Sequence, residues 1–312
     1  MKQDYVLGVD VGGTKVLVGY VQCDGTILSS KRYPMDRSCT PNVLKSIYFA
    51  VDDFLQNNKN NPPPLAVGFG LVGRCDTKNG IWVRANNIPI PNPVNLAEEI
   101  FSRHGLKSYL NNDVFCATLA ELHYGAGKIY DDFILINVGT GISMGIVAGG
   151  NLVTGAGNVA GEVGQWCLNF KTGTVETLEQ LSSGGGMITR AKNEMAAYNS
   201  SLAHLQEQDL HSAAIFEAAD KGDALAMKIV SDAVDALCMT VSSLITMFNP
   251  GAVVLAGSVA CTPGLTDKFV AHAKINAYPS SMLDLQEICL SKLEVQTVGL
   301  IGAAYVAWQG LK

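Results

Sequence analysis

Two segments far apart in the chain share a residue pattern that could bind phosphate. Each has an apolar run rich in β-branched residues, a polar residue, a turn of glycine and threonine, and a second apolar run. They are residues 5–20, with Asp10, Gly12 and Gly13, and residues 133–147, with Asn137 and the turn 139–141. Glycines let a backbone approach a ligand and aim its N–H groups at an oxyanion. Two such turns suggest a polyphosphate held from both sides.

The elements that must position these turns follow one order, twice. Each segment predicts a β-hairpin, followed by alternating strand and helix patterns. After the first hairpin these are a helix over 42–56, a strand over 65–69, a helix over 96–104, a strand over 107–110 and a helix over 114–124. After the second they are a helix over 224–248, a strand over 252–256, a helix over 265–275, a strand over 288–293 and a helix from 300. We therefore expect two α/β lobes with mixed sheets and a cleft between them.

The same order argues against a dinucleotide-binding fingerprint. In that motif the glycines open a helix, whereas Gly12 and Gly13 lead into another apolar strand.

Composition favours a globular protein with a small-molecule partner. The 312 residues suffice for two cores, and 48% are hydrophobic and 16% charged. A net charge of −6 without a Lys/Arg block argues against a nucleic-acid surface. No uninterrupted apolar run approaches the roughly 18 to 20 residues of a membrane span, and the N-terminus lacks the parts of a signal peptide. We expect a cytoplasmic protein that does not bind a membrane.

The eight cysteines are scattered, and none form a Cys-x-x-Cys pair. This spacing indicates neither a disulfide framework nor a cysteine zinc site. We expect buried thiols.

Five motifs, in order and with plausible spacing, resemble the ROK family of sugar kinases, which have the actin/hexokinase-like (ribonuclease H-like) fold. They lie at 10–15, 111–113, 139–141, 161–164 and 249–257. One short glycine-rich match is weak, but five together are specific. The resemblance spans the chain from first strand to last helix. It implies a small lobe of residues 1–115 plus 299–312, with the phosphate loop and sugar contacts. Residues 116–298 would form a large lobe with the second phosphate loop, the adenosine site and a helical insertion.

The resemblance implies ATP and Mg²⁺ as cofactors. Asp10 would orient Mg²⁺ through water, since Mg²⁺ keeps most of its waters. Gly12, Gly13 and Thr14 would approach the phosphates, and Lys15 would add charge. Gly139, Thr140 and Gly141 would form the second phosphate clamp, and Gly257 would also contact the cofactor. The alternative is that Gly12 and Gly13 only turn a hairpin that Asp10 caps.

Asp113 is the candidate general base, because it follows a strand and opens a helix where the family has its catalytic aspartate. A carboxylate there can accept the proton of a weakly acidic sugar hydroxyl, and the helix N-terminus favours its ionised form. The alternative is that Asp113 is only the helix N-cap.

Other sugar contacts follow from the resemblance position by position. They are Gly70, Asn87, Asn112, Glu162 and Glu179, with Gln165 where the family has a histidine that also binds structural zinc. Each could instead be a solvated loop residue. The loop 166–177 has Cys167 as its only cysteine. Zinc needs about four N or S ligands, so we expect no zinc site, and a changed sugar preference.

The sequence thus predicts ATP- and Mg²⁺-dependent phosphorylation of a hexose or N-acetylhexosamine, by a possible homodimer. One alternative is a sugar-sensing ROK transcriptional regulator, although the first strand begins near Tyr5 and leaves no room for a DNA-binding helix-turn-helix. The other is a non-catalytic sugar-binding protein, against which the presence of both Asp10 and Asp113 argues.

Overall fold

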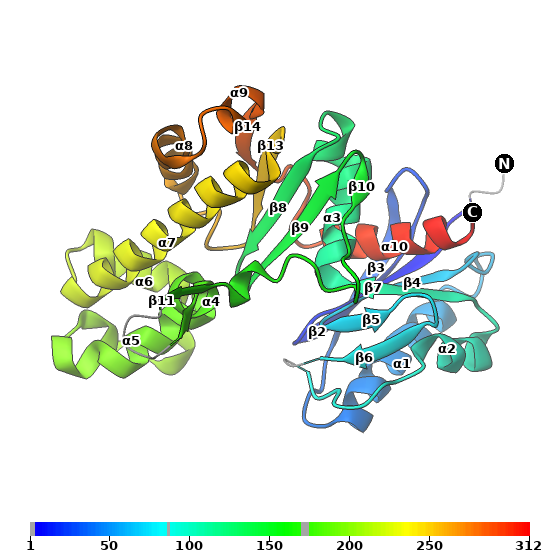
Figure 1. The fold of residues 1–312 in the computed structure, drawn as a ribbon. Coiled ribbons are helices and arrows are strands. Elements are labelled where there is room, and N and C mark those ends of the chain that lie inside the picture. The colour runs from blue at the N-terminus through cyan, green and yellow to red at the C-terminus, as the bar shows by residue number, and fades with distance from the viewer. Residues whose placement is uncertain (1–3, 86–87, 170–174) are drawn as a thin grey trace. The chain divides into compact units, whose positions relative to one another are not determined.

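The computed structural model describes residues 4–85, 88–169 and 175–312 (Figure 1). The chain divides into two compact units. Unit 1 comprises residues 1–128, 152–160 and 293–312, and unit 2 comprises residues 129–151 and 161–292. Each contains a five-stranded sheet.

The sheet of unit 1 has the order β3-β2-β1-β4-β7. Its first three strands form an antiparallel meander, and β4 and β7 run parallel to β1. The strands are β1 (Val6–Val11), β2 (Lys15–Val21), β3 (Ile27–Pro34), β4 (Val67–Leu71) and β7 (Ser108–Asn112). A separate two-stranded hairpin, β5 (Arg74–Asp76) and β6 (Ile81–Arg84), follows β4.

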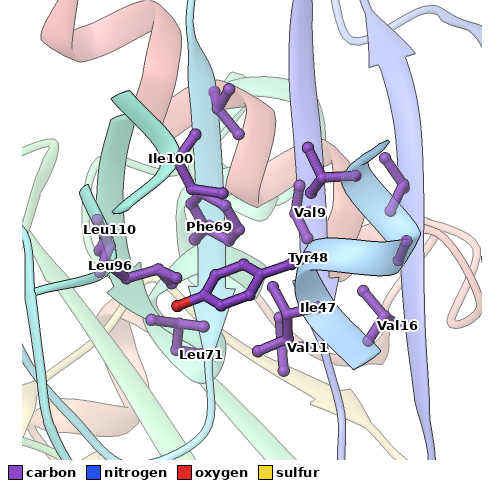
Figure 2. Close-up of a cluster of buried hydrophobic side chains, with 14 of the residues drawn as sticks. Val9, Val11, Val16, Ile47, Tyr48, Phe69, Leu71, Leu96, Ile100 and Leu110 are labelled. Atoms are coloured by element: carbon purple, nitrogen blue, oxygen red, sulfur yellow. The ribbon is translucent and has the colours of Figure 1, made fainter. Parts of the chain in front are cut away.

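One face of this sheet is covered by α1 (Thr40–Asn57) and α2 (Leu96–His104). Because side chains alternate along a strand, Val9 and Val11 of β1 point to this face. Figure 2 shows them packed with Ile47 of α1 and Phe69 of β4, all fully buried. This is the main apolar core of unit 1.

The other face carries α10 (Val298–Gly310), the last helix of the chain, beside α3 (Asp113–Tyr124) and the short η1 (Ala126–Lys128). Glycines on this face let α10 approach the strands. A Cβ at Gly8 would lie 2.7 Å from the Leu300 carbonyl oxygen, and one at Gly68 only 1.9 Å from that of Ala303. The helix therefore packs directly on the strand backbones.

Unit 2 has the sheet order β10-β9-β8-β13-β14, with β8 and β9 antiparallel and β13 parallel to β8 and β14. The strands are β8 (Phe133–Val138), β9 (Ile142–Ala148), β10 (Asn151–Leu152), β13 (Ala252–Ala256) and β14 (Glu287–Leu290), with a small pair β11 (Cys167–Asn169) and β12 (Glu176–Thr177). The helices are η2 (Val163–Gln165), α4 (Leu178–Ser182), α5 (Gly184–Tyr198), η3 (Ser201–His204), η4 (Glu207–Asp209), α6 (Ser212–Asp220), α7 (Ala224–Phe248), α8 (Leu265–Asn276) and α9 (Ser281–Asp284).

The predicted mixed-sheet α/β fold and both hairpins are confirmed, and each predicted strand and helix is present within a few residues. Two helices match their predicted bounds because their caps can be read locally. Asn95 caps α2 and Gly105 ends it at φ 67°, while Asp223 caps α7 and Asn249 ends it at φ 46°. The strand β3 and the hairpin β5–β6 were not predicted.

The expectation that the cysteines are buried needs correction. Cys75, Cys116 and Cys238 are buried, but Cys23, Cys39, Cys167 and Cys261 are exposed because they lie in turns, caps or edge segments, and Cys289 is intermediate. The helix α7 is long and apolar enough to cross a membrane by length and composition, although Lys228, Asp232 and Asp235 interrupt its apolar sequence, so the expectation of no uninterrupted apolar run of that length holds. However, 61% of its most apolar window is buried, as expected for a core helix of unit 2.

Candidate active site

The register of three strands in unit 1 places candidate residues from distant parts of the sequence side by side. Asp10 of β1 pairs with Gly70 of β4, and Gly70 pairs with Asn111 of β7. These strands are parallel, so their carboxyl ends meet at one edge of the sheet. At that edge β1 continues into the glycine turn and β7 into Asp113.

The first glycine turn is a closed hairpin turn. The Gly12 N–H donates to the Lys15 carbonyl oxygen at 3.0 Å, and the Thr14 carbonyl accepts from the Met35 N–H at 3.1 Å. Gly12, Gly13 and Lys15 are half-buried, and Thr14 is exposed. The turn is therefore anchored at both ends yet open to solvent at its tip.

The carboxyl group of Asp10 lies at the N-terminal turn of α10. A Cβ on Gly299, the second residue of this helix, would lie 2.8 Å from Asp10 Cγ, so only glycine leaves room for the carboxylate. Burial raises the pKa of Asp10 to about 6, and the charge of Lys15 partly opposes this. The helix N-terminus also favours the charged form. A nearby cation would therefore stabilise the ionised form of Asp10.

Asp113 begins α3, but it is not the N-cap. Asn112 holds that position, and its Oδ1 accepts from the N–H groups of Val114 at 2.9 Å and Phe115 at 3.3 Å. The Asp113 carboxylate accepts from the Val114 N–H at 3.0 Å. The capping alternative for Asp113 is therefore wrong, because Asn112 meets the requirement of the helix terminus.

A buried thiol lies near the two candidate aspartates, Asp10 and Asp113. The pKa of the Cys116 thiol is raised well above its ordinary value, first by burial and then by the negative charges of Asp10 and Asp113. A Cβ on Gly70 would lie 3.2 Å from Cys116 Sγ. The Cys116 thiol therefore lies against Gly70, near enough to Asp10 and Asp113 for their charges to act on it.

The triplet 111–113 is braced by a residue that sequence reasoning missed. The buried Asn111 Oδ1 accepts from the Asn112 N–H at 2.8 Å and from Asn158 Nδ2 at 3.1 Å. Asn158 is one of three non-glycine residues at positive φ in the described part of the chain, at 57°. Asparagine tolerates this conformation better than most residues. The Gly155-Ala-Gly-Asn158 run was a turn signal that pointed to it.

The side chain of Asn112 is occupied on both sides. Its Oδ1 caps α3, and its Nδ2 donates to the Gly73 carbonyl at 2.9 Å. An amide NH₂ carries two hydrogens, so a sugar contact from Nδ2 stays compatible with this arrangement.

In unit 2, the second glycine turn is held by three neighbours. The Gly139 carbonyl accepts from the Gly184 N–H at 2.8 Å, and the Thr140 carbonyl from the Gly185 N–H at 3.0 Å, which anchors α5 on the turn. Gly257 has φ 92°, and a Cβ there would lie 2.4 Å from the Val138 carbonyl oxygen. The predicted clamp residues and Gly257 therefore lie together.

Glu179 joins this turn to the predicted sugar contacts. Its Oε2 accepts from the Ile142 N–H at 2.9 Å and would lie 2.7 Å from a Cβ on Gly141. Its Oε1 lies 3.4 Å from Gln165 Nε2. Although Glu162 is exposed, its pKa is raised, by partial desolvation and then by the charge of Glu179. Unit 2 thus brings together two carboxylates, an amide and the second turn.

A pocket of about 550 Å³ opens beside this cluster. Its lining includes Thr140 of the turn, Glu179 and Gln180 of α4, and Ser183 and Arg190 at α5. Predicted residues of unit 1 and of unit 2 thus form one group in each unit, while Asn87 lies outside the described residues.

The side chains at this site suit Mg²⁺ better than a metal ion that needs three or more protein ligands. Among the described residues no three His, Cys, Asp or Glu side chains group to hold a metal. Mg²⁺ is commonly bound by one or two carboxylates with waters and substrate phosphates, and Asp10 could supply one such carboxylate. That the chain has no structural zinc stays a prediction.

Comparison with known proteins identifies the family. The ROK family profile matches residues 6–309, so the chain belongs to the ROK family. It is 29% identical over 310 residues to a glucokinase from Thermotoga maritima, with 96% of each chain covered. It is 27% identical over 325 residues to an N-acetylmannosamine kinase from Escherichia coli, which covers 98% of this chain and 99% of the relative.

Solved structures show the same fold. A ROK family glucokinase from Streptomyces griseus in complex with glucose and AMPPNP has a TM-score of 0.77 at 27% identity, with 98% of this chain and 100% of that chain covered. A ROK family transcriptional regulator, a homolog of E. coli MLC protein, has a TM-score of 0.84 at 21% identity, covering 98% of this chain and 78% of that chain. The actin-like fold class is therefore confirmed.

The burial of Asp10 predicts a pH-dependent gain of stability on Asp10→Asn. An ordinary carboxyl has a pKa of 3.8, and in the folded chain the Asp10 pKa is about 6. Between these values the unfolded chain loses its proton first, so the stability of the wild type falls as pH rises. Asparagine does not ionise. The free energy of unfolding of the variant should match that of the wild type near pH 4 and exceed it by up to about 3 kcal/mol at pH 8.

Urea denaturation without metal ions measures this difference. In a Trp166→Phe background, tryptophan emission comes from Trp82 and Trp308 and reports unit 1 alone. Asp4→Asn, at an exposed position, is the control and should change stability little at either pH. An Asp10→Asn effect of equal size at both pH values would contradict the assignment.

Proposed function

We propose that this sugar kinase transfers the γ-phosphoryl group of Mg·ATP to a hydroxyl of a hexose or an N-acetylhexosamine, with Asp113 as the general base. The observation that carries the proposal is the strand register Asp10–Gly70–Asn111, which brings the first glycine turn and Asp113 to one edge of the sheet in unit 1. Phosphoryl transfer depends mainly on positioning and on electrostatic stabilisation, and this edge offers both.

The first turn would hold the phosphates of the donor. Backbone N–H groups at Gly12 and Gly13, the Thr14 hydroxyl and the Lys15 ammonium are suitable donors for phosphate oxygens. Asp10 would hold Mg²⁺ through water, and the ion would neutralise charge on the transferred group. Gly299 leaves the space that the Asp10 carboxylate needs.

Asp113 would accept the proton of the attacking hydroxyl. A sugar hydroxyl is a very weak acid, so a positioned carboxylate assists as the new P–O bond forms. The first turn of α3 favours the ionised form of Asp113. The chain of hydrogen bonds from Asn158 through Asn111 to the Asn112 N–H fixes the backbone that carries it.

The residues gathered in unit 2 would bind the sugar and the rest of the donor. Glu162, Gln165 and Glu179 offer acceptors and an amide donor for hydroxyl groups, as do Asn112 in unit 1 and Asn87. The backbone of Gly70 in unit 1 would lie against the sugar ring. Gly139, Thr140, Gly141 and Gly257 would contact the donor, and the pocket beside Thr140 is the candidate place for adenosine. Gln165 keeps a hydrogen-bonding side chain where the family has histidine, so we infer a changed sugar preference.

The relatives support the substrate class. The names of the T. maritima and E. coli relatives specify glucose and N-acetylmannosamine as acceptors, and the S. griseus structure contains an ATP analogue. A cytoplasmic location, a homodimer and the absence of nucleic-acid or membrane partners stay predictions.

A coupled ADP-release assay over a panel of hexoses and N-acetylhexosamines tests the proposal. We expect sugar-stimulated, Mg²⁺-dependent turnover with at least one of them. If no sugar stimulates turnover while calorimetry shows sugar binding, the non-catalytic alternative is correct. If neither turnover nor sugar binding is found, the proposed substrate class is wrong.

The role of Asp113 predicts the effect of Asp113→Asn. The amide keeps the size of the side chain but cannot accept the proton, so kcat should fall roughly 10²- to 10⁴-fold. The Kd for the sugar should change less than about threefold, because ground-state contacts persist. A steady-state turnover assay measures kcat, and calorimetry measures the Kd for the sugar. Asp220→Asn, exposed at the end of α6, is the control, and equal turnover of Asp113→Asn and wild type would remove Asp113 from the base role.

The bracing of Asn111 predicts the effect of Asn158→Gly. Glycine accepts φ 57° without strain but removes the 3.1 Å hydrogen bond to Asn111. We expect kcat to fall about tenfold, equivalent to about 1.4 kcal/mol of transition-state stabilisation, with little change in the melting temperature. Asn199→Gly makes the same exchange at φ 49° at the end of α5 and should leave kcat unchanged. Equal kcat values for both variants would show that Asn158 does not position the base.

A further inference from the structure

The segment that follows β3 in unit 1 runs beside the first glycine turn. In the ladder between β2 and β3, Lys15 pairs with Pro34, the last residue of β3. The next residue, Met35, donates its N–H to the Thr14 carbonyl at 3.1 Å. The chain beyond Met35 is therefore tied to the turn that Gly12, Gly13 and Thr14 form.

Hydrogen bonds fix this segment on both sides of Arg37. The Asp36 N–H donates to Ser46 Oγ at 3.0 Å, and the Ser38 N–H donates to Asp36 Oδ1 at 2.9 Å. Asn42 Nδ2 donates to Asp36 Oδ2 at 3.0 Å and to Ser38 Oγ at 2.9 Å. The backbone at Arg37 is thus held at residues 36 and 38, and little conformational entropy remains to be lost there.

The neighbouring carboxylate is already occupied. Both oxygens of Asp36 accept hydrogen bonds, and those from Ser38 and Asn42 lower the pKa of the Asp36 carboxyl. The ion pairs of the described residues do not include Arg37. Arg37 is exposed, so its charged group is accessible to a ligand.

The Arg37 guanidinium lies at the glycine turn. Its Nη1 is 3.9 Å from the position that a Cβ on Gly13 would take. A ligand lodged against Gly13 would therefore contact this group. A guanidinium presents a rigid fork of N–H donors that matches the oxygens of a phosphate, and it cannot lose its charge near neutral pH.

We propose that Arg37 is a further phosphate-binding residue, which contacts the oxygens of a phosphate group held at Gly12 and Gly13. This inference rests on the proposed function. It adds a second side-chain cation at this turn, in addition to Lys15. Two sources share this chemistry: the polyphosphate of the donor nucleotide and the phosphate group of the sugar phosphate product.

The contrast with Arg32 supplies a matched control. Arg32 is also exposed and lies five positions earlier, on β3, where its Nη2 lies 3.3 Å from Gln296 Oε1. Arg32→Gln and Arg37→Gln each remove one positive charge from an exposed position of unit 1. Only the second removes a guanidinium from Gly13.

Calorimetric titration of the full chain with ATP, ADP, AMP and a hexose phosphate tests the inference independently of turnover. For Arg37→Gln we expect ATP and ADP affinity, hexose phosphate affinity, or both, to fall about tenfold, and AMP affinity to change little. Arg37→Lys should recover part of the loss, since it restores the charge but not the fork. Arg32→Gln should bind every ligand within about twofold of the wild type.

The outcomes separate the two sources and the two proposals. A loss for ATP and ADP alone assigns Arg37 to the donor, and a loss for the hexose phosphate alone assigns it to the product. Equal affinities of Arg37→Gln and wild type for both ligand classes would overturn the inference while leaving the proposed function intact. If the wild type itself binds neither class, both proposals fail. Unchanged melting temperature of Arg37→Gln confirms that the comparison is between folded proteins.

Discussion

The candidate site of unit 1 depends on the parallel pairing of β4 with β1 on one side and β7 on the other. This register brings Asp10, Gly70 and Asn111 to one level, although about a hundred positions of sequence separate the first from the last. A slip of one residue would turn each side chain to the opposite face of the sheet. Asp10 would then enter the apolar core that Val9 and Val11 occupy. The buried valines therefore also fix the place of the polar residues.

A second constraint acts on the face where α10 packs. Glycines in the strands let the helix approach, and Gly299 lets its first turn lie against Asp10. The carboxylate loses solvation there, which raises its pKa, but it lies where the helix N-terminus favours negative charge. A residue that weakens its own lobe in this way is typical of functional positions, where local stability is given up for chemistry.

Local sequence patterns were sufficient to predict the hairpins, the buried strands and the helices whose capping residues can be recognised in the sequence. Asn95 and Gly105 delimit α2 by side-chain and φ preferences that act within a few residues. The site could be predicted only in part. The sequence suggested either a base or a cap for Asp113, and only the structure shows that Asn112 takes the cap. The roles of Asn158 and Arg37 depend on their contacts with Asn111 and Gly13. These contacts join residues far apart in the chain, so the sequence pattern does not predict them.

The helix α10 follows every other element of unit 1 in the sequence, and this order has a consequence for biosynthesis. Every strand of the unit 1 sheet emerges from the ribosome before this helix, and until then Val6, Leu17 and Val21 lack the Leu300 and Ala304 side chains that cover them. At translation rates of about 5–20 residues per second, this apolar surface stays uncovered for roughly 10 to 40 s after residue 128 is made. The chain of unit 2, residues 129–151 and 161–292, is synthesised before α10, so unit 1 is completed after unit 2 although all its strands are made first.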